Sequence, residues 1–366
     1  MINTGPMERT IWLVAHSNVA VKNIAEKLDK VGFREFKLLV SKDFHYDWHK
    51  HLYERLEHCF IRSDMFGGRA VTASQHLLDK HTNKPTRVVL CTLSMLSNPR
   101  IDDFTRQVPV HTVIFDEASQ IEVGEYLPLL QRFQHSLKKM VFIGDDKQLA
   151  PFGQDDIGQL RSIFEFPHLR EQAHFLDTQY RMPLVIGSFI SRHVYDQKLM
   201  TVHDITNKAA CRFLDVKKGK EEKSGKSWAN QQETSMVIHL ARIYHKQGKQ
   251  FRIITPYDGQ RSVIEKQLQS AKLPWEDKCF NVDSFQGNEE DHIIVSLVRT
   301  QGVGFLTNMR RMNVMLTRCK MSMIICTNRD FVTKGKAADT LVGQLALTVD
   351  PDAWLDSHDI VNGILR

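Results

Sequence analysis

The chain has 366 residues, of which 42% are hydrophobic and 25% are charged. This length allows two ordinary domains with sizeable cores, and the composition excludes a small disulfide scaffold, a fibrous protein and a largely disordered chain. Lysine and arginine together number 49 against 43 for aspartate and glutamate. The resulting net charge of +6 mildly favours polyanionic partners.

Cysteine spacing and the length of apolar runs indicate the class of protein. There is no CxxC pair, and most cysteines lie in apolar runs, so we expect packed, reduced thiols with neither disulfides nor structural zinc. The longest apolar stretches are far shorter than the roughly 20 residues of a membrane span, and the N-terminus lacks the apolar core of a signal peptide. We expect a soluble protein that is not exported and has no membrane partner.

Short β-rich apolar runs alternate with helical patterns along the chain. This alternation predicts an α/β protein with parallel sheets that helices cover on both faces. A helical stretch around 181–200 separates two groups of runs, so two domains are expected. Because open α/β sheets bind ligands at the carboxyl ends of their strands, functional residues are expected there. The predicted strands are residues 11–15, 88–91, 112–115, 140–143, 252–255, 293–298 and 322–326.

Three segments fall outside this alternation. Residues 217–227 (KKGKEEKSGKS) contain no apolar side chain, which predicts an exposed hairpin tip or loop that is solubilising rather than functional. Residues 336–366 lose the strand pattern and predict an acidic, weakly helical C-terminal appendage. In residues 43–60, His45 and His49 have the spacing of metal ligands on a helix, but an apolar stripe beside them favours an ordinary amphipathic helix.

Two adjacent carboxylates end one predicted strand, in the string TVIFDEASQ at 112–120. In a nucleoside triphosphatase, the first carboxylate holds Mg²⁺ and the second polarises the attacking water. Acidic residues are also favoured at helix starts, so a solvated strand end or a helix cap is the alternative for Asp116 and Glu117.

Polar sequence strings that follow later predicted elements contain side chains suited to binding phosphate. In GDDKQLAP at 144–151, Gly144 permits a tight turn and the Gln148 amide can donate to a γ-phosphate or a water. The strings QYRM at 179–182 and RRMNVMLTR at 310–318 supply arginines. An arginine from a second domain can neutralise charge on a transferred phosphoryl group, and a surface or inter-domain salt bridge is the alternative.

These strings stand in order with SNVAV at 17–21, TPYDGQR at 255–261 and VDSFQGNEED at 282–291. The ordered set resembles the superfamily 1 helicases of the up-frameshift type, which are RNA and DNA translocases acting in nonsense-mediated decay and related pathways. The resemblance covers roughly residues 10–330.

The resemblance implies a P-loop helicase core of two RecA-like parallel-sheet domains. The first would span residues 1–180 and carry a helical insertion at about 41–85. The second would span residues 181–335, followed by a tail at 336–366.

The resemblance also implies catalytic roles for five residues. Asp116 would hold Mg²⁺, Glu117 would activate the attacking water, and Gln148 would sense the γ-phosphate. Arg181 and Arg318 would close on the triphosphate from the second domain. ATP and Mg²⁺ are therefore the expected cofactors.

Three further residues would bind the nucleotide in this family. The resemblance places Tyr180 near the base and Glu289 near the ribose. Gly287 would lie in a turn that links the nucleotide cleft to the nucleic-acid groove.

Nucleic-acid contacts are expected at five residues. Ser17 is the natural N-cap of an amphipathic helix, and a helix N-terminus suits a phosphate. The family has strand-contacting motifs here and at the string CTLS, so Ser17, Asn18 and Thr92 are candidates. Asp283 and Ser284 of the later motif complete the set. Ordinary helix capping is the alternative for the helix starts.

No GxxxxGK[ST] string occurs in the 366 residues. In the family this loop precedes the strand at 11–15, and its own strand lies beside the one that carries the Gly144 turn. It supplies N–H groups and a lysine to the phosphates and a hydroxyl to Mg²⁺, and phosphoryl transfer depends on such positioning. We therefore expect an N-terminally incomplete first domain, less stable than the second, and little ATP turnover by this chain.

Two functions remain open at this stage. One is an ATP-dependent helicase or translocase on single-stranded RNA or DNA, RNA more than DNA, whose phosphate loop lies upstream. The other is a non-hydrolysing paralogue that binds RNA or protein, with an RNA affinity indifferent to ATP. RNA-decay or RNA-processing proteins are the expected partners, and the cytoplasm is the expected location, with the nucleus as the alternative.

Overall fold

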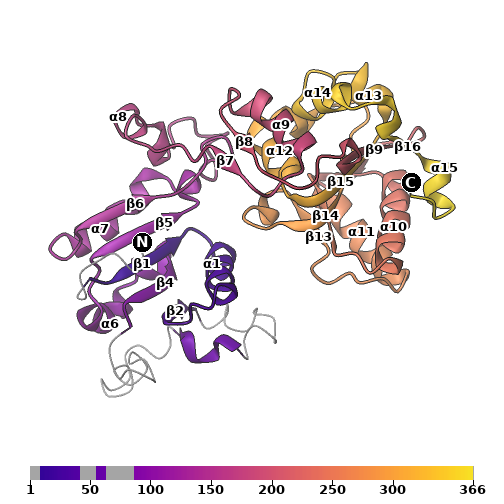
Figure 1. Ribbon diagram of the computed structural model, residues 1–366. Helices are drawn as coiled ribbons and strands as arrows, with labels where there is room; N and C mark the ends of the chain where they lie inside the picture. The colour runs from indigo at the N-terminus through magenta and orange to yellow at the C-terminus, as the bar shows by residue number, and fades with distance from the viewer. Residues whose placement is uncertain (1–8, 42–54, 63–85, 366) are drawn as a thin grey trace. The chain divides into compact units, whose positions relative to one another are not determined.

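The computed structural model describes residues 9–41, 55–62 and 86–365, and the chain forms two compact units (Figure 1). The first unit comprises residues 1–146 and 150–173, and the second comprises 147–149 and 174–366. The second unit begins before the expected boundary at 181. The reason is that β7 (Thr178–Gln179) pairs with β8 (Met200–Thr201), which ties this segment to the residues that follow it.

A six-stranded parallel sheet forms the first unit, in the order β3-β2-β4-β1-β5-β6. Its register aligns Ala15 with both Thr92 and Asp116, so the ends of three strands lie side by side. The strands are β1 (Ile11–Ala15), β2 (Phe36–Val40), β3 (Phe60–Arg62), β4 (Val88–Thr92), β5 (Thr112–Asp116) and β6 (Lys139–Phe142). The α-helices are α1 (Asn18–Lys30), α5 (Leu93–Leu96), α6 (Asp102–Gln107), α7 (Leu127–Phe133) and α8 (Pro167–Arg170).

Helices cover both faces of this first sheet. On one face α1 packs its apolar stripe, including Val21 and Ala25, against the strands, as the spacing predicts. On the other face α6 and α7 bury Phe104 and Leu129 against Trp12. Each such side chain contributes roughly 1.5–3 kcal/mol when fully buried.

The second unit contains another six-stranded parallel sheet, in the order β13-β12-β14-β15-β9-β16. Its strands are β9 (Cys211–Asp215), β12 (Phe251–Thr255), β13 (Cys279–Asn281), β14 (Glu290–Ser296), β15 (Cys319–Thr327) and β16 (Trp354–Asp356). The hairpin strands are β10 (Glu222–Ser224) and β11 (Ser227–Ala229). The helices are α9 (Leu184–Val194), α10 (Gln231–Lys246), α11 (Asp258–Ser270), α12 (Met309–Leu316), α13 (Arg329–Thr333), α14 (Leu341–Thr348) and α15 (Ser357–Val361).

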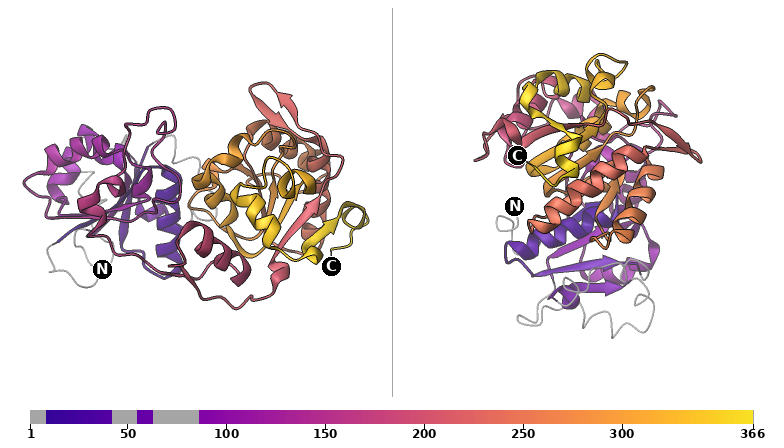
Figure 2. Two further views of the ribbon diagram at one scale, coloured as in Figure 1. Left: turned by 90° about the horizontal axis from the view of Figure 1, so that it is seen from above. Right: turned by 90° about the vertical axis from the view of Figure 1, so that its right-hand side faces the viewer.

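Two apolar layers flank this second sheet, and Figure 2 gives further views of the helices that form them. Helices α9, α12 and α14 pack on one face, where Ile190, Met312 and Leu345 are buried. Helices α10 and α11 pack on the other, where Leu240 and Ile264 are buried. The expected α/β class with two parallel sheets is therefore confirmed.

All of the predicted strands are present, with ends that differ by up to three residues. Strands β2, β3, β9, β13 and β16 were not predicted, because they are short or carry a charge. In β2, for example, Lys37 is buried and its ammonium group donates to the carbonyl oxygen of His58 at 2.9 Å. The predicted hairpin at 217–227 is confirmed by the antiparallel pairing of β10 with β11.

The C-terminal residues are not an appendage. Helix α14 buries Leu341 and Leu345 in the core of the second unit, and β16 pairs with β9 as the edge strand of its sheet. The prediction was wrong because β16 is only three residues long, too short to produce a strand pattern.

Part of the expected helical insertion at 41–85 lies outside the described residues, including His45 and His49. In the described part, residues 60–62 form the edge strand β3, where a helix was expected. All six cysteines are buried, as their apolar neighbours predict. Among the described helices, none combines the length and hydrophobicity of a membrane span.

Replacing Gly343 with alanine tests the packing of α14. A Cβ atom at this position would lie 2.0 Å from the carbonyl oxygen of Ala337, so Gly343→Ala should lower the free energy of unfolding by about 1–3 kcal/mol in a urea titration. Gly158→Ala is the matched control, because its Cβ would meet nothing within 4 Å. Equal stabilities of the two variants would contradict the packed position of α14.

Candidate functional site

The two expected catalytic carboxylates lie at the carboxyl end of β5 in the first unit, where Asp116 is the last residue of the strand and Glu117 follows it. Asp116 is half-buried, and burial raises the pKa of its carboxyl, although the Glu117 N–H and the charge of Lys27 oppose the rise. Glu117 has φ 51° and ψ 39°, the left-handed conformation. For a residue other than glycine this conformation costs on the order of 1–3 kcal/mol and is characteristic of functional sites.

The turn after β6 packs against the turn that carries these carboxylates. The N–H of Ala118 donates to the carbonyl oxygen of Ile143 at 2.9 Å. A Cβ atom on Gly144 would lie only 2.8 Å from the backbone nitrogen of Ser119. Only glycine fits this approach, so Gly144 sets the spacing between the two turns.

Helix starts follow β1 and β4 at the same edge of the first sheet. The Ser17 hydroxyl accepts from the N–H of Ala20 and the Thr92 hydroxyl from the N–H of Met95, each at 3.1 Å. Ser17 and Asn18 are exposed, and Thr92 is half-buried. The capping interpretation is confirmed for both hydroxyls, and their contact with nucleic acid stays a prediction.

Arg318 lies at the end of α12 in the second unit, with only 2% of its surface exposed. Its Nη2 donates to Gln148 Oε1 at 3.0 Å and to Thr317 Oγ1 at 2.8 Å, and its Nε donates to the carbonyl oxygen of Val314 at 2.8 Å. Residues 147–149 are part of this unit, so the hydrogen bond joins two of the expected catalytic residues within it.

Arg181 pairs with Glu289 in the same unit. Its Nε lies 2.5 Å from Glu289 Oε2, and its Nη1 donates to the carbonyl oxygen of Thr317 at 3.4 Å. The neighbouring Tyr180 is 70% exposed, and Gly287 has φ 76°, which favours glycine. Two of the residues expected at the nucleotide, Arg181 and Glu289, thus lie together near the end of α12.

Asp283 and Ser284 follow β13 at the carboxyl edge of the second sheet, and both are exposed. Asp283 pairs with Arg311 at 3.1 Å. The Ser284 N–H donates to Asn281 Oδ1 at 2.8 Å, and its hydroxyl donates to the Asn281 carbonyl oxygen at 3.0 Å. These residues present polar atoms in the short helical turn Asp283–Phe285, and their contact with nucleic acid stays a prediction.

A buried polar network at this edge was missed by the sequence analysis. Glu233 is fully buried, and its Oε2 accepts from the Ser296 hydroxyl at 2.6 Å and the Val298 N–H at 2.8 Å. Gln260 donates to Ser296 Oγ at 2.9 Å, and the Asn230 amide donates to the Val298 carbonyl oxygen at 3.0 Å.

The network holds Val298 in the left-handed region, at φ 71°. Such a conformation is strained for a β-branched residue and persists only when its surroundings enforce it. Gln260 belongs to the string TPYDGQR, so the sequence could have marked it as a candidate. Asn230 and Glu233 belong to none of the strings that carry the resemblance.

Asp116 could serve as one of only a few protein ligands to a magnesium ion. Within residues 9–41, 55–62 and 86–365, no group of three or more His, Cys, Asp and Glu side chains could hold a metal. Mg²⁺ commonly takes only one or two protein carboxylates and completes its shell with water and substrate phosphates. Asp116 therefore fits as a protein ligand that acts together with a nucleotide.

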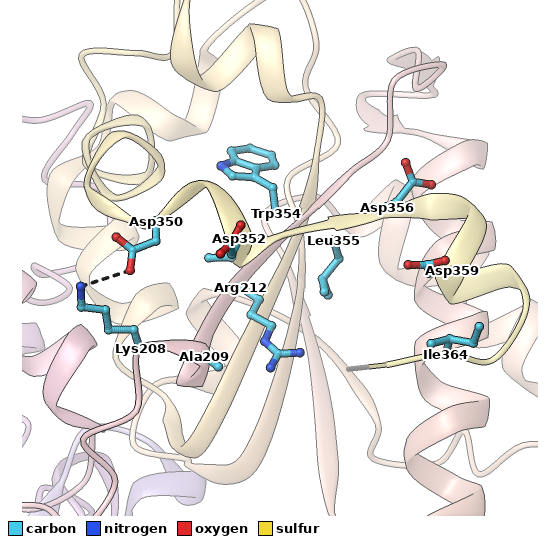
Figure 3. A pocket seen from close by; sticks show the side chains of 11 residues that line it. Lys208, Ala209, Arg212, Asp350, Asp352, Trp354, Leu355, Asp356, Asp359 and Ile364 are labelled. Atoms are coloured by element: carbon cyan, nitrogen blue, oxygen red, sulfur yellow. Dashed lines mark hydrogen bonds and ion pairs between the residues drawn. The ribbon is translucent and has the colours of Figure 1, made fainter.

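A pocket of about 480 Å³ lies beside β16 and is lined by a different set of residues (Figure 3). Four aspartates, Arg212 and Lys208 line it, and Lys208 pairs with Asp350 at 3.1 Å. None of the residues singled out from the sequence contributes to it. The pocket is therefore separate from the candidate site.

Residues 53–154 and 160–330 match two family models, each described as an AAA domain. "Regulator of nonsense transcripts 1" of Dictyostelium discoideum is 28% identical over 89% of this chain and 28% of its own length. "Probable helicase senataxin" of Mus musculus is 32% identical over 66% of this chain and 10% of its own length. "The structure of PRRSV helicase" has a TM-score of 0.42 and 17% identity, covering 88% of this chain and 52% of that chain.

The chain belongs to the superfamily 1 helicases of the up-frameshift type. It spans less than a third of the length of the two curated relatives, at 28% and 10%. The two parallel sheets of this helicase chain correspond to the RecA-like domains that the motif order implied.

The pH dependence of stability tests the buried network of this helicase chain. Burial raises the pKa of Glu233 from 4.5 to about 8. Above pH 4.5 the unfolded chain loses this proton while the folded chain keeps it, so the free energy of unfolding should fall as the pH rises towards 8.

Glu233→Gln should remove this decline, because glutamine does not titrate. In urea titrations between pH 5 and pH 8, we expect the free energy of unfolding of the wild type to fall by more than about 1.4 kcal/mol relative to that of the variant. This value is the free-energy equivalent of a shift of one pKa unit. Glu222→Gln, at an exposed position, is the control and should keep the wild-type slope. Parallel profiles for wild type and Glu233→Gln would contradict a neutral buried carboxyl.

Proposed function

We propose that this chain is the motor region of an ATP-dependent helicase or translocase that tracks along single-stranded nucleic acid, RNA more than DNA. Family membership supports this function. The observation that carries it is the Arg318–Gln148 hydrogen bond, because it joins the proposed γ-phosphate sensor to a proposed phosphate-binding arginine. Two residues 170 positions apart come together with the chemistry that the motif order implies.

Each side chain has a defined role in the proposed nucleotide site. When bound, Mg²⁺ would neutralise charge on the phosphates, and Asp116 would hold it. The cation would also favour the ionised form of Asp116 and so oppose the effect of burial on its pKa. Glu117 would accept a proton from the attacking water, and the exposed ring of Tyr180 would stack on the base.

The two arginines would exchange partners when they bind phosphate. Arg181 is paired with Glu289, and Arg318 is bonded to Gln148. A triphosphate carries more negative charge than either partner, and bidentate geometry suits guanidinium to phosphate. Glu289, once released, would be available to the ribose hydroxyls, with Gly287 in the adjoining turn.

The proposed nucleic-acid contacts lie at turns and helix starts. Ser17, Asn18 and Thr92 present hydroxyl, amide and backbone N–H groups that can donate to phosphates. Asp283 and Ser284 present polar atoms in the second unit. Such contacts to the strand's backbone suit tracking that does not depend on base sequence. RNA-decay or RNA-processing proteins are the proposed partners, in the cytoplasm, with the nucleus as the alternative.

We also propose that the 366-residue chain by itself hydrolyses ATP slowly or not at all. The reason is chemical, because none of its residues forms a GxxxxGK[ST] loop to hold the β- and γ-phosphates. The alternative function, a non-hydrolysing module that binds RNA or protein, rests on the same observation.

Phosphate release by the purified chain tests this second proposal. With Mg²⁺, ATP and single-stranded RNA, we expect turnover at the background of a protein-free sample, unchanged in Glu117→Gln. A titration with a fluorescent ATP analogue, with Arg318→Ala as control, separates binding from chemistry. Turnover that Glu117→Gln abolishes, or micromolar binding that Arg318→Ala removes, would contradict an inactive chain.

Affinity for RNA and DNA of identical sequence tests the choice of nucleic acid. We expect the chain to bind a single-stranded RNA oligonucleotide more tightly than its DNA counterpart in fluorescence anisotropy at one fixed salt concentration. The measurement is repeated with Mg·ATP, and an unchanged RNA affinity favours the non-hydrolysing module. Equal affinities would contradict the RNA preference, and no binding to either strand would contradict the nucleic-acid function itself.

A further inference from the structure

Residues 217–229, which comprise the β10–β11 hairpin and the residues that lead into it and are called the hairpin below, form a strongly basic segment. Residues 217–229 contain five lysines and two glutamates. All five lysines are exposed, and no ion pair within the described part of the chain neutralises them. They are Lys217, Lys218, Lys220, Lys223 and Lys226. The hairpin stands out from the body of the second unit in Figure 2.

One of the two glutamates is engaged elsewhere and does not offset this charge. Glu221 accepts from Arg299 in bidentate geometry at 3.0 and 3.1 Å, and from the N–H groups of Thr300 and Gln301 at 2.7 and 2.9 Å. Burial alone would raise the pKa of the Glu221 carboxyl, but these donors hold it below its usual value. The carboxylate is a charged anchor between the hairpin and the loop after β14.

The anchored hairpin lies against the carboxyl edge of the second sheet. The Ser227 hydroxyl accepts from the N–H of Gly259, and a Cβ at Gly259 would lie 3.0 Å from the Trp228 carbonyl oxygen. The adjacent Asp258 accepts from the Asn281 amide at 3.0 Å, which in turn caps Ser284. Hydrogen bonds thus connect the hairpin to the proposed nucleic-acid residues after β13.

The aromatic side chain of the hairpin, Trp228, is half-buried and has one face occupied. The Arg299 guanidinium lies over this face, 4.2 Å from the centre of the ring. Exposed contacts of the hairpin are therefore lysine ammonium groups, which bind phosphate as point charges and do not distinguish sequences.

We propose that the β10–β11 hairpin is a phosphate-binding element that extends the contact surface for single-stranded nucleic acid beyond Asp283 and Ser284. Its anchoring by Glu221 and Ser227 distinguishes it from an unattached solubilising loop, because a backbone that is already held in place loses less entropy when its lysines bind. The interpretation of this segment as solubilising rather than functional is the alternative. The inference rests on the proposed nucleic-acid function and adds a binding element that the motifs do not include.

The salt dependence of RNA affinity tests the hairpin. For single strands, log K falls with log salt by about 0.7 for each phosphate neutralised, so Lys218→Ala, Lys220→Ala and Lys223→Ala together should reduce the slope by about 2. At 100 mM salt the affinity for a single-stranded RNA oligonucleotide should fall about 10- to 100-fold. The triple lysine-to-arginine variant should restore both values.

The matched control removes the same charge elsewhere. Lys246, Lys266 and Lys336 are exposed and lie outside the hairpin, so their triple alanine variant should keep the wild-type slope. Equal salt slopes in the two triple-alanine variants would overturn the inference about the hairpin while leaving the proposed nucleic-acid function intact. If the wild type bound no RNA at all, both the inference and the proposed function would be overturned. If the hairpin triple-alanine variant lost binding to polyglutamate but kept the wild-type affinity for RNA, the hairpin would be a binding element for an acidic protein segment. That result would also overturn the inference.

Discussion

The parallel pairing of strands is the constraint on which the rest of this structure depends. The strands of each six-stranded sheet pair in parallel, so the turns at their carboxyl ends meet at one edge of the sheet. In the first sheet this brings the ends of β1, β4 and β5 side by side. Residues far apart in the chain thus become neighbours because their strands pair, even where their side chains do not contact each other.

Charge compensation determines what happens to the polar groups gathered at these edges. A buried guanidinium is tolerated only with hydrogen-bonding partners, and Arg318 has them in Gln148, Thr317 and the carbonyl of Val314. Arg181 and Glu289, which are partly exposed, pair as opposite charges. Each of these arrangements gives a guanidinium group defined hydrogen-bonding partners.

Strain is concentrated at the same edges. Glu117, directly after β5, and Val298, two residues after β14, both adopt left-handed conformations. The first lies beside the carboxylate Asp116 and the second beside Arg299. Neither conformation would persist in isolation. The first is enclosed by the turn at Gly144 and the second by the hydrogen bonds to Glu233 and Asn230, so local strain is offset by contacts from distant parts of the chain.

The sequence by itself determined the alternation of strands and helices, the two sheets, the caps at Ser17 and Thr92 and the order of the motifs. These depend on local periodicity and on side chains a few residues apart. Only the tertiary structure decided that Gln148 bonds to Arg318, that Glu233 is buried beside Val298, and that β16 completes a sheet. These contacts join residues tens to hundreds of positions apart, and their energy comes from burial and partner geometry, which no local pattern encodes.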